Sequence, residues 1–245
     1  MKYMINYYYI CHTGCVRKKN QDNYSCNGIY LDISHQNTDT GIGRSTNKDN
    51  IIVGVFDGLG GEEKGEDASF IAAKIISSQN GKRGNIKELQ EVFLKANDEI
   101  CKFAVENGVN TMGTTAACLA FYKNEILLAN IGDSKVFRFS EGKITQISRD
   151  HTTAGLYGMK PPLSQFLGIP ESEMMISPYI ARGYYNVGDC YLICSDGLTD
   201  MVSNEVIEET LRNVSEEAVC NTLLNLALDN GGQDNITIVY CSIKN

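Results

Sequence analysis

Several features that would assign a sequence to a specialised class are missing here. No apolar run approaches the roughly 20 residues that a membrane-spanning helix needs. The first residues, MKYMINYYYI, lack the long apolar stretch and the small-residue cleavage site of a signal peptide. Nine cysteines are present without a CxxC pair, which argues against a disulfide framework or a zinc site. We therefore expect a cytoplasmic protein with reduced thiols and no membrane span.

Basic residues are also scarce relative to acidic ones. Lysine and arginine total 22 against 30 acidic residues, so the net charge is −8. This balance argues against nucleic-acid and anionic-membrane partners and suits a protein that collects cations. With 245 residues, 42% of them hydrophobic, the chain is long enough for a buried core. We expect a single domain over residues 1–245 that is monomeric.

Helices and strands are indicated by the spacing of the apolar residues. Apolar positions recur at helical spacing around residues 68–76, 89–103, 204–212 and 215–229. Short apolar runs favour strands at 3–12, 24–31, 51–56, 190–195 and 235–242. Because strands and helices are grouped and do not alternate, the expected fold class is α+β, with helices covering antiparallel sheets.

Three further segments have a distinct character. Residues 33–50 are rich in Asn, Thr, Ser and Gly, which predicts a surface loop. Residues 113–148 alternate strand-like runs with short turns, which predicts an antiparallel meander. Residues 149–186 show little periodicity and contain GMKPPL, which predicts a partly irregular excursion from the sheet.

Aspartates stand at the margins of four predicted strands. Asp57, Asp133 and Asp196 each follow an apolar run, and Asp234 immediately precedes one. Neighbouring antiparallel strands begin and end beside each other, so these carboxylates are expected to gather at one edge. Grouped carboxylates repel unless a cation neutralises them, and hard divalent ions prefer oxygen ligands. A single Asp-Gly pair is more typical of a turn than of a ligand, but four acids in the same setting predict a metal site.

The ordered motifs resemble those of a known family. They include VFDGLGGEEKGEDAS, ANIGDSKVFRF, LICSDGLTDMVS and GGQDNITIVY, in the order found in bacterial type 2C metal-dependent serine/threonine protein phosphatases. The resemblance runs from about residue 12 to 241 and implies a four-layer α/β/β/α sandwich with two central antiparallel sheets. It also implies that residues 149–186 form a flap subdomain beside the active site.

The resemblance assigns roles to individual residues. Asp57 would bridge two Mn²⁺ or Mg²⁺ ions with the help of the Gly58 carbonyl, and Asp196 and Asp234 would hold the first ion. Asp133 would help to bind a third, weaker ion. Arg17 would bind the substrate phosphate, and Asp22 would orient the attacking water.

The implied activity is hydrolysis of phosphoserine and phosphothreonine in proteins by a metal-activated water. The expected partners are phosphorylated proteins, including a partner Ser/Thr kinase. Many bacterial relatives carry a histidine where this sequence has Glu62. The general acid is therefore open between Glu62 and water held by the metal.

Two competing hypotheses remain. Cys11, Gly14 and Arg17 have the C-x-x-G-x-x-R spacing of a cysteine-dependent tyrosine phosphatase. That mechanism requires a helix after Arg17 to lower the thiol pKa, but KKNQDNYS has no apolar helical period. We therefore expect Cys11 to be a buried strand residue. The second alternative is a catalytically silent relative that binds phosphoproteins, although none of the metal-binding acids is missing.

Overall fold

The computed structural model describes residues 3–33, 38–59, 64–155 and 160–245. Its strands are β1 (Met4–His12), β2 (Asp22–Cys26), β3 (Ile29–Tyr30), β4 (Thr38–Thr46), β5 (Ile51–Asp57), β6 (Ala116–Tyr122), β7 (Glu125–Ile131), β8 (Lys135–Ser140), β9 (Lys143–Gln146), β10 (Tyr179–Tyr184), β11 (Cys190–Cys194) and β12 (Ile236–Lys244). Its helices are α1 (Gly65–Ser77), α2 (Ile86–Glu106), α3 (Asp196–Thr199), α4 (Asn204–Asn213) and α5 (Glu216–Asp229).

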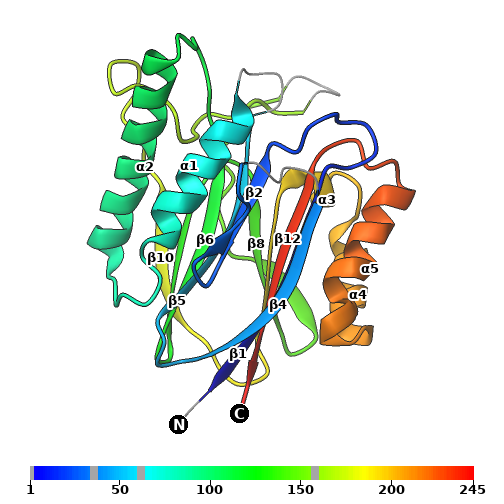
Figure 1. Ribbon diagram of the computed structural model, residues 1–245. Helices are drawn as coiled ribbons and strands as arrows, with labels where there is room; N and C mark the ends of the chain where they lie inside the picture. The colour runs from blue at the N-terminus through cyan, green and yellow to red at the C-terminus, as the bar shows by residue number, and fades with distance from the viewer. Residues whose placement is uncertain (1–2, 34–37, 60–63, 156–159) are drawn as a thin grey trace.

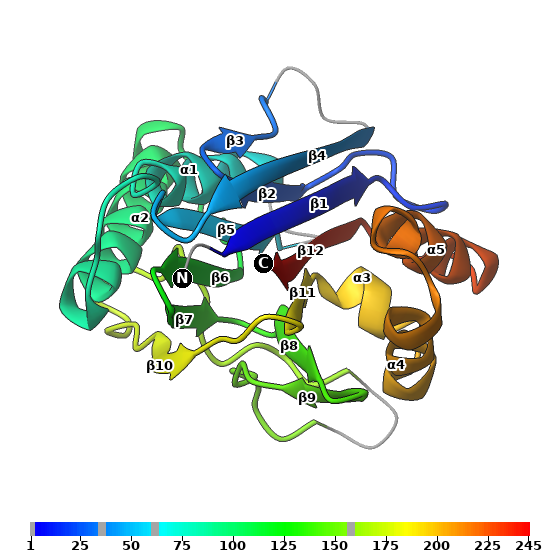
Figure 2. The ribbon, with the colours of Figure 1, turned by 90° about the horizontal axis from the view of Figure 1, so that it is seen from below.

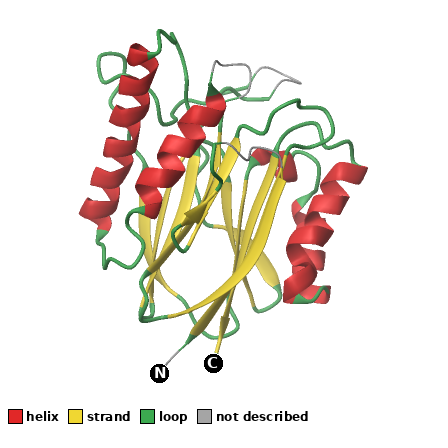
Figure 3. Ribbon diagram, viewed as in Figure 1, coloured by secondary structure: helices red, strands yellow, loops and turns green. Residues whose placement is uncertain are grey.

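The strands form two six-stranded sheets in which the pairings between described strands are antiparallel. The first sheet has the order β4-β1-β12-β11-β8-β9, and the second has the order β10-β7-β6-β5-β2-β3. The sheets lie face to face, with α1 and α2 covering the second sheet and α3, α4 and α5 covering the first (Figures 1 and 2). The expected four-layer α/β/β/α sandwich is therefore confirmed (Figure 3).

Three hydrophobic clusters fill the spaces between the four layers. The cluster between α1, α2 and the second sheet includes Phe56, Ile76 and Phe93. The cluster between the two sheets is rich in aromatic side chains, among them Tyr24, Phe121 and Tyr191, and the third cluster packs α4 and α5 on the first sheet. Burial of these apolar side chains removes them from water and holds both sheets in a fixed relative position.

Helix α2 illustrates why the sequence folds as it does. Asn85 caps its first turn in a capping box with Glu88, and each side chain satisfies a backbone N–H of the other residue. Its buried residues Leu89, Phe93 and Ile100 recur at helical spacing and face the second sheet. The predicted helices at 204–212 and 215–229 correspond in the same way to α4 and α5.

The predicted surface loop at 33–50 is wrong over most of its described length. Thr38–Thr46 forms β4, which pairs with β1 at the edge of the first sheet. A Cβ atom at Gly41 or Gly43 would lie 2.3 Å or 2.2 Å from the hydroxyl oxygen of Tyr9 or Tyr7. The glycines therefore let tyrosine rings pack against β4. Because this edge strand carries few apolar residues and several glycines, its composition resembles that of a loop.

The predicted meander at 113–148 is also corrected. β6 and β7 pair in the second sheet, whereas β8 and β9 pair in the first, so the chain crosses between sheets at residues 132–134. The excursion at 149–186 is irregular only in part, because Tyr179–Tyr184 forms β10 along the edge of β7.

Candidate active site

The four predicted strand-margin aspartates lie at one end of the sandwich. Asp57 ends β5, and Asp133 follows β7 in the crossing between the sheets. Asp196 begins α3 directly after β11, and Asp234 lies two residues before β12. The prediction that one sheet edge gathers them is wrong in detail, because each sheet contributes two. Their convergence therefore depends on the packing of the two sheets.

These aspartates line one cavity of about 290 Å³. Arg17, Thr115 and Lys160 also line it, and Pro161, Pro162 and Leu163 of the predicted flap complete its wall. The cavity therefore collects charged groups from the β1–β2 loop, both sheets and the segment at 149–186.

Two cationic side chains engage the carboxylates. Arg17 donates a hydrogen bond of 2.7 Å to Asp234, and the Lys160 ammonium group contacts both Asp196 and Asp200, the latter at 2.9 Å. About half of the Lys160 side chain is exposed to solvent. The protein thus places two positive charges where several negative charges converge.

Burial and mutual repulsion shift the titration of the acids. The pKa of Asp57 is raised well above its ordinary value, first by burial and then by the charges of Asp196 and Asp22. Burial, followed by Asp196, raises the pKa of Asp133 to about 6. Both shifts mean that the negative charges are unfavourable without cations among them.

Asp22 lies behind the cavity and does not line its wall. It is 3% exposed and stands opposite Asp57 in the pairing of β2 with β5. Ser195 and Thr237 donate hydrogen bonds of 2.8 Å and 2.7 Å to the same Asp22 oxygen, Oδ2. Desolvation by burial raises the pKa of Asp22. This carboxylate is held in one orientation by two hydroxyl groups, one from Thr237 on β12 and one from Ser195 directly after β11.

Gly58 is required by the close approach of two segments. Its N–H donates to the Gln21 carbonyl, and a Cβ atom there would lie 2.4 Å from the carbonyl oxygens of Gln21 and Gly65. Any larger residue would push the Asp57 turn away from β2 or α1. Glu62, the candidate general acid, lies outside the described residues.

Cys11 is a fully buried residue of β1, as expected. Burial is the main cause that raises the pKa of its thiol to about 12, and the charge of Asp22 adds to the shift. A nucleophilic cysteine needs a lowered pKa and access to substrate. Cys11 has neither, and no helix follows Arg17 before β2 begins.

The donor set fits a hard divalent cation, because every candidate ligand is an oxygen atom. Among the described residues, no three Asp, Glu, His or Cys side chains are arranged to hold one ion together. The carboxylates instead engage Lys160 and Arg17. A cation bound at Asp196 or Asp234 would compete with these contacts.

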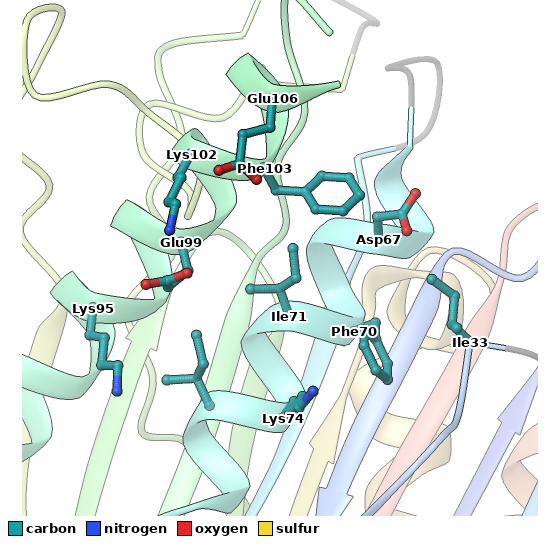
Figure 4. A pocket seen from close by; sticks show the side chains of 11 residues that line it. Ile33, Asp67, Phe70, Ile71, Lys74, Lys95, Glu99, Lys102, Phe103 and Glu106 are labelled. Atoms are coloured by element: carbon teal, nitrogen blue, oxygen red, sulfur yellow. The ribbon is translucent and has the colours of Figure 1, made fainter. Parts of the chain in front are cut away.

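A larger groove lies elsewhere and has a different chemistry. It encloses about 530 Å³ between α1 and α2, with Phe70, Ile71 and Phe103 among its lining residues and lysines and acids at its rim (Figure 4). It contains none of the four aspartates and shares no lining residue with the carboxylate cavity among the described residues.

Three residues that shape the site were not predicted: Lys160, Ser195 and Thr237. Lys160 lies in GMKPPL, where no periodic pattern signalled its position. Ser195 and Thr237 lie close in sequence to the motif aspartates at 196 and 234, but no pattern in the sequence indicates that their hydroxyls reach Asp22.

The family model and two relatives that match this chain are described as phosphatases. Residues 35–228 match the family model described as Protein phosphatase 2C. The chain is 31% identical over 225 residues to the serine/threonine protein phosphatase PstP of Mycobacterium tuberculosis, covering 84% of this chain but 44% of PstP. It is also 31% identical over 237 residues to the serine/threonine phosphatase Stp of Listeria welshimeri, covering 84% of this chain and 90% of Stp. The chain thus spans less than half of the PstP length.

Solved structures are similar over almost the whole chain. A crystal structure of the M. tuberculosis phosphatase PstP superposes with a TM-score of 0.80 and 25% identity, covering 99% of this chain and 100% of that one. The catalytic domain of a PstP in complex with two manganese ions superposes with a TM-score of 0.78 and 26% identity, over 99% of this chain and 100% of that one.

Proposed function

Because the chain belongs to the protein phosphatase 2C family, we propose that it is a metal-dependent phosphatase that hydrolyses phosphoserine and phosphothreonine in proteins. One observation carries this proposal beyond family membership: Asp57, Asp133, Asp196 and Asp234 line one cavity together with Arg17. Carboxylates that bind divalent ions, beside an arginine that binds phosphate, are the groups that metal-assisted phosphoryl transfer to water needs.

Each acid has a proposed role in holding Mn²⁺ or Mg²⁺. Asp57, with the Gly58 carbonyl, would bridge two ions, and Asp196 and Asp234 would complete the site of the first. Asp133, which repels Asp196 across the cavity, would help to hold a third and weaker ion. When bound, the ions make water acidic enough to attack phosphorus near neutral pH and neutralise charge on the phosphate.

The remaining two residues would bind the substrate phosphate and orient the attacking water. Arg17 would exchange its hydrogen bond with Asp234 for one with a phosphate oxygen, which its planar group can bind in two-point contact. Asp22 would orient the attacking water from behind Asp57, with its own carboxylate fixed by Ser195 and Thr237. The in-line attack needs no covalent bond to the enzyme.

The same proposal covers the setting of the enzyme. We expect residues 1–245 to act as a single cytoplasmic, monomeric phosphatase domain with residues 149–186 as a flap beside the site. No helix in the described ranges is long and apolar enough to cross a membrane. The substrates would be phosphorylated proteins, including a Ser/Thr kinase whose phosphorylation the enzyme reverses.

Hydrolysis of p-nitrophenyl phosphate and of a phosphothreonine peptide tests the proposal. Both activities should require added Mn²⁺, disappear with EDTA and survive alkylation by iodoacetamide, because the nucleophile is water and Cys11 is buried. Asp196→Ala should lower kcat by at least about a thousandfold, the scale expected for loss of a major electrostatic catalyst. Cys11→Ser should retain most of the activity.

Matched controls separate the alternatives. Asp229→Ala removes an exposed aspartate of α5 and should leave activity unchanged, while circular dichroism shows whether each variant is folded. Activity that persists in EDTA and is lost with iodoacetamide would support a cysteine-dependent enzyme. Binding of the phosphopeptide without turnover in Mn²⁺ or Mg²⁺ would support the silent relative.

A further inference from the structure

A second polar pocket lies at the opposite end of the sandwich from the aspartates. We call it the hairpin pocket; it encloses about 330 Å³, and its lining includes Lys48, Asn50, Arg83, Tyr122, Lys123 and Glu125. These residues come from the β4–β5 turn, the α1–α2 connection and the β6–β7 hairpin. β5 starts next to Asn50 and ends at Asp57 seven residues later, so roughly 20 Å separates the pocket from the candidate active site.

The hairpin pocket is cationic although the protein carries a net charge of −8. It contains three basic side chains, Lys48, Arg83 and Lys123, against the single carboxylate of Glu125. None of the three has an ion pair within 4.0 Å among the residues that the structure describes. Like charges that share a pocket repel each other, and a bound anion would relieve that repulsion.

The backbone that carries these side chains is fixed. Lys123 N–H donates to the Asn47 carbonyl at 2.8 Å, and Gly81 N–H donates to the Asn50 carbonyl at 2.9 Å. The Tyr185 hydroxyl also donates to the Lys123 carbonyl. These bonds tie the three segments together, so a ligand would need to order side chains only, which keeps the entropic cost of binding low.

The polar groups favour a phosphate group over other anions. The planar guanidinium of Arg83 can grip two phosphate oxygens, while the lysines add point charges around them. The Tyr122 hydroxyl, which is 6% exposed as a residue, accepts a hydrogen bond from Gly84 N–H and can donate its own proton to an acceptor in the pocket. The N-terminus of α2 does not contribute to phosphate binding, because the capping box of Asn85 and Glu88 already satisfies backbone N–H groups there.

The volume of the pocket indicates a ligand larger than a single phosphate ion. A cavity of about 330 Å³ lies at the lower end of the range typical of small-molecule sites. We propose that the hairpin pocket is a second, non-catalytic site that binds small molecules carrying a phosphate group or a short polyphosphate chain. This inference does not depend on the proposed phosphatase activity.

Calorimetric titration of metal-free protein with inorganic phosphate, pyrophosphate and adenosine monophosphate tests the proposal. The titrations use an Arg17→Ala background, so that the active-site arginine adds no binding. At least one probe should bind at one site, and Arg83→Ala with Lys123→Ala should weaken it at least tenfold. Tightest binding of pyrophosphate identifies a polyphosphate ligand, and tightest binding of adenosine monophosphate identifies an organic phosphate.

The matched control is Lys82→Ala with Lys87→Ala, which removes the same charge from exposed positions that do not line the pocket. This pair should change affinity by less than twofold. A second variant, Glu125→Gln, removes the one carboxylate among the described lining residues and should tighten binding about threefold, because its repulsion of the anion is lost. This expected increase in affinity still tests the proposed site if the Arg83→Ala, Lys123→Ala protein folds poorly.

Turnover of p-nitrophenyl phosphate shows whether the hairpin pocket is independent of the active site. With Arg17 restored, the Arg83→Ala, Lys123→Ala protein should keep its Mn²⁺-dependent kcat. The proposal is overturned if none of the three probes binds up to about 10 mM. It is also overturned if the control pair weakens binding as much as the pocket pair does.

Discussion

Lys160 and Arg17 act as internal counter-ions of the carboxylate cavity. Lys160 contacts Asp196 and Asp200, and Arg17 contacts Asp234. A divalent ion that binds Asp196, as proposed, would compete with the ammonium group, since both would neutralise the same carboxylate. The free energy of metal binding is therefore reduced by whatever the lysine contact contributes.

Replacing Lys160 by methionine should tighten metal binding. Methionine keeps the apolar stem but removes the charge, and an exchanged ion pair that is about half exposed is worth up to roughly 1 kcal/mol. We expect the Kd for Mn²⁺, measured by isothermal titration calorimetry, to fall by about threefold to fivefold. Lys244→Met is the matched control, because Lys244 pairs with Glu216 outside the cavity and its side chain is exposed to a similar degree. Unchanged or weaker Mn²⁺ binding in Lys160→Met would contradict the competition.

Single residues could be predicted where the sequence carried a local signal. The four aspartates each stand beside an apolar strand run, and the structure places them around one cavity. The partners of Asp22 had no such signal, because Ser195 and Thr237 lie 173 and 215 residues away in sequence. Lys160 was equally hidden, since its contact with Asp196 spans 36 residues. Contacts of this kind are fixed only when the sheets pack.

One buried side chain of helix α2 forms hydrogen bonds with the segment at 149–186. Asn97 is 5% exposed; its Oδ1 accepts hydrogen bonds from Gly168 N–H and Ile169 N–H at 2.8 Å and 3.1 Å, and its Nδ2 donates to the Ile169 carbonyl at 2.9 Å. Leu167 also bridges to Thr114, next to the cavity residue Thr115. The helix therefore anchors the irregular segment where that segment reaches the site.

Asn97→Ala should destabilise the protein by about 2–4 kcal/mol, because it leaves buried backbone groups without hydrogen-bond partners. Urea unfolding followed by circular dichroism measures this loss. Asn107→Ala, at the exposed C-terminal end of the same helix, is the control and should cost less than about 1 kcal/mol. Equal losses for the two variants would show that the Asn97 contacts are not a structural anchor.

Elements were predictable where amphipathic spacing was strong. The helices at 65–77, 86–106, 204–213 and 216–229 follow their apolar stripes. β4 was missed because an edge strand can be polar and glycine-rich, and its packing partners are the Tyr7 and Tyr9 rings of another strand. The crossing at 132–134 was missed because a turn between two strands looks the same whether they share a sheet or not.

Two aspartates of the carboxylate cavity make the stability of the whole molecule depend on pH. The folded-state pKa of Asp133, raised by burial to about 6, exceeds its unfolded value of 3.8, and the Asp57 pKa is also raised. The folded protein therefore holds more protons than the unfolded chain in this window. Without metal, the contribution of these groups to stability falls as pH rises from about 4 to about 7.

Manganese should reverse this trend. Cations bind the ionised carboxylates and release their protons, so the increase in Tm caused by saturating Mn²⁺ should be larger at pH 7.5 than at pH 5. Differential scanning fluorimetry with and without Mn²⁺ at both pH values measures it. Asp133→Asn should flatten the pH dependence. An Mn²⁺-induced increase in Tm that is the same at both pH values would refute the assignment of buried, mutually repelling acids to a metal site.

The central position of β12 sets the order in which the molecule can assemble during synthesis. β12 lies between β1 and β11 in the first sheet, and Met4 stands opposite Lys244 in its register with β1. The ribosome releases β12 after all the other described strands, so β1 and β4 must wait for it before they can join β11, β8 and β9. The second sheet draws its strands from residues 22–184 and can pair earlier. Asp196 follows β11 and Asp234 precedes β12. These two aspartates therefore reach their final positions only when β12 has joined the first sheet.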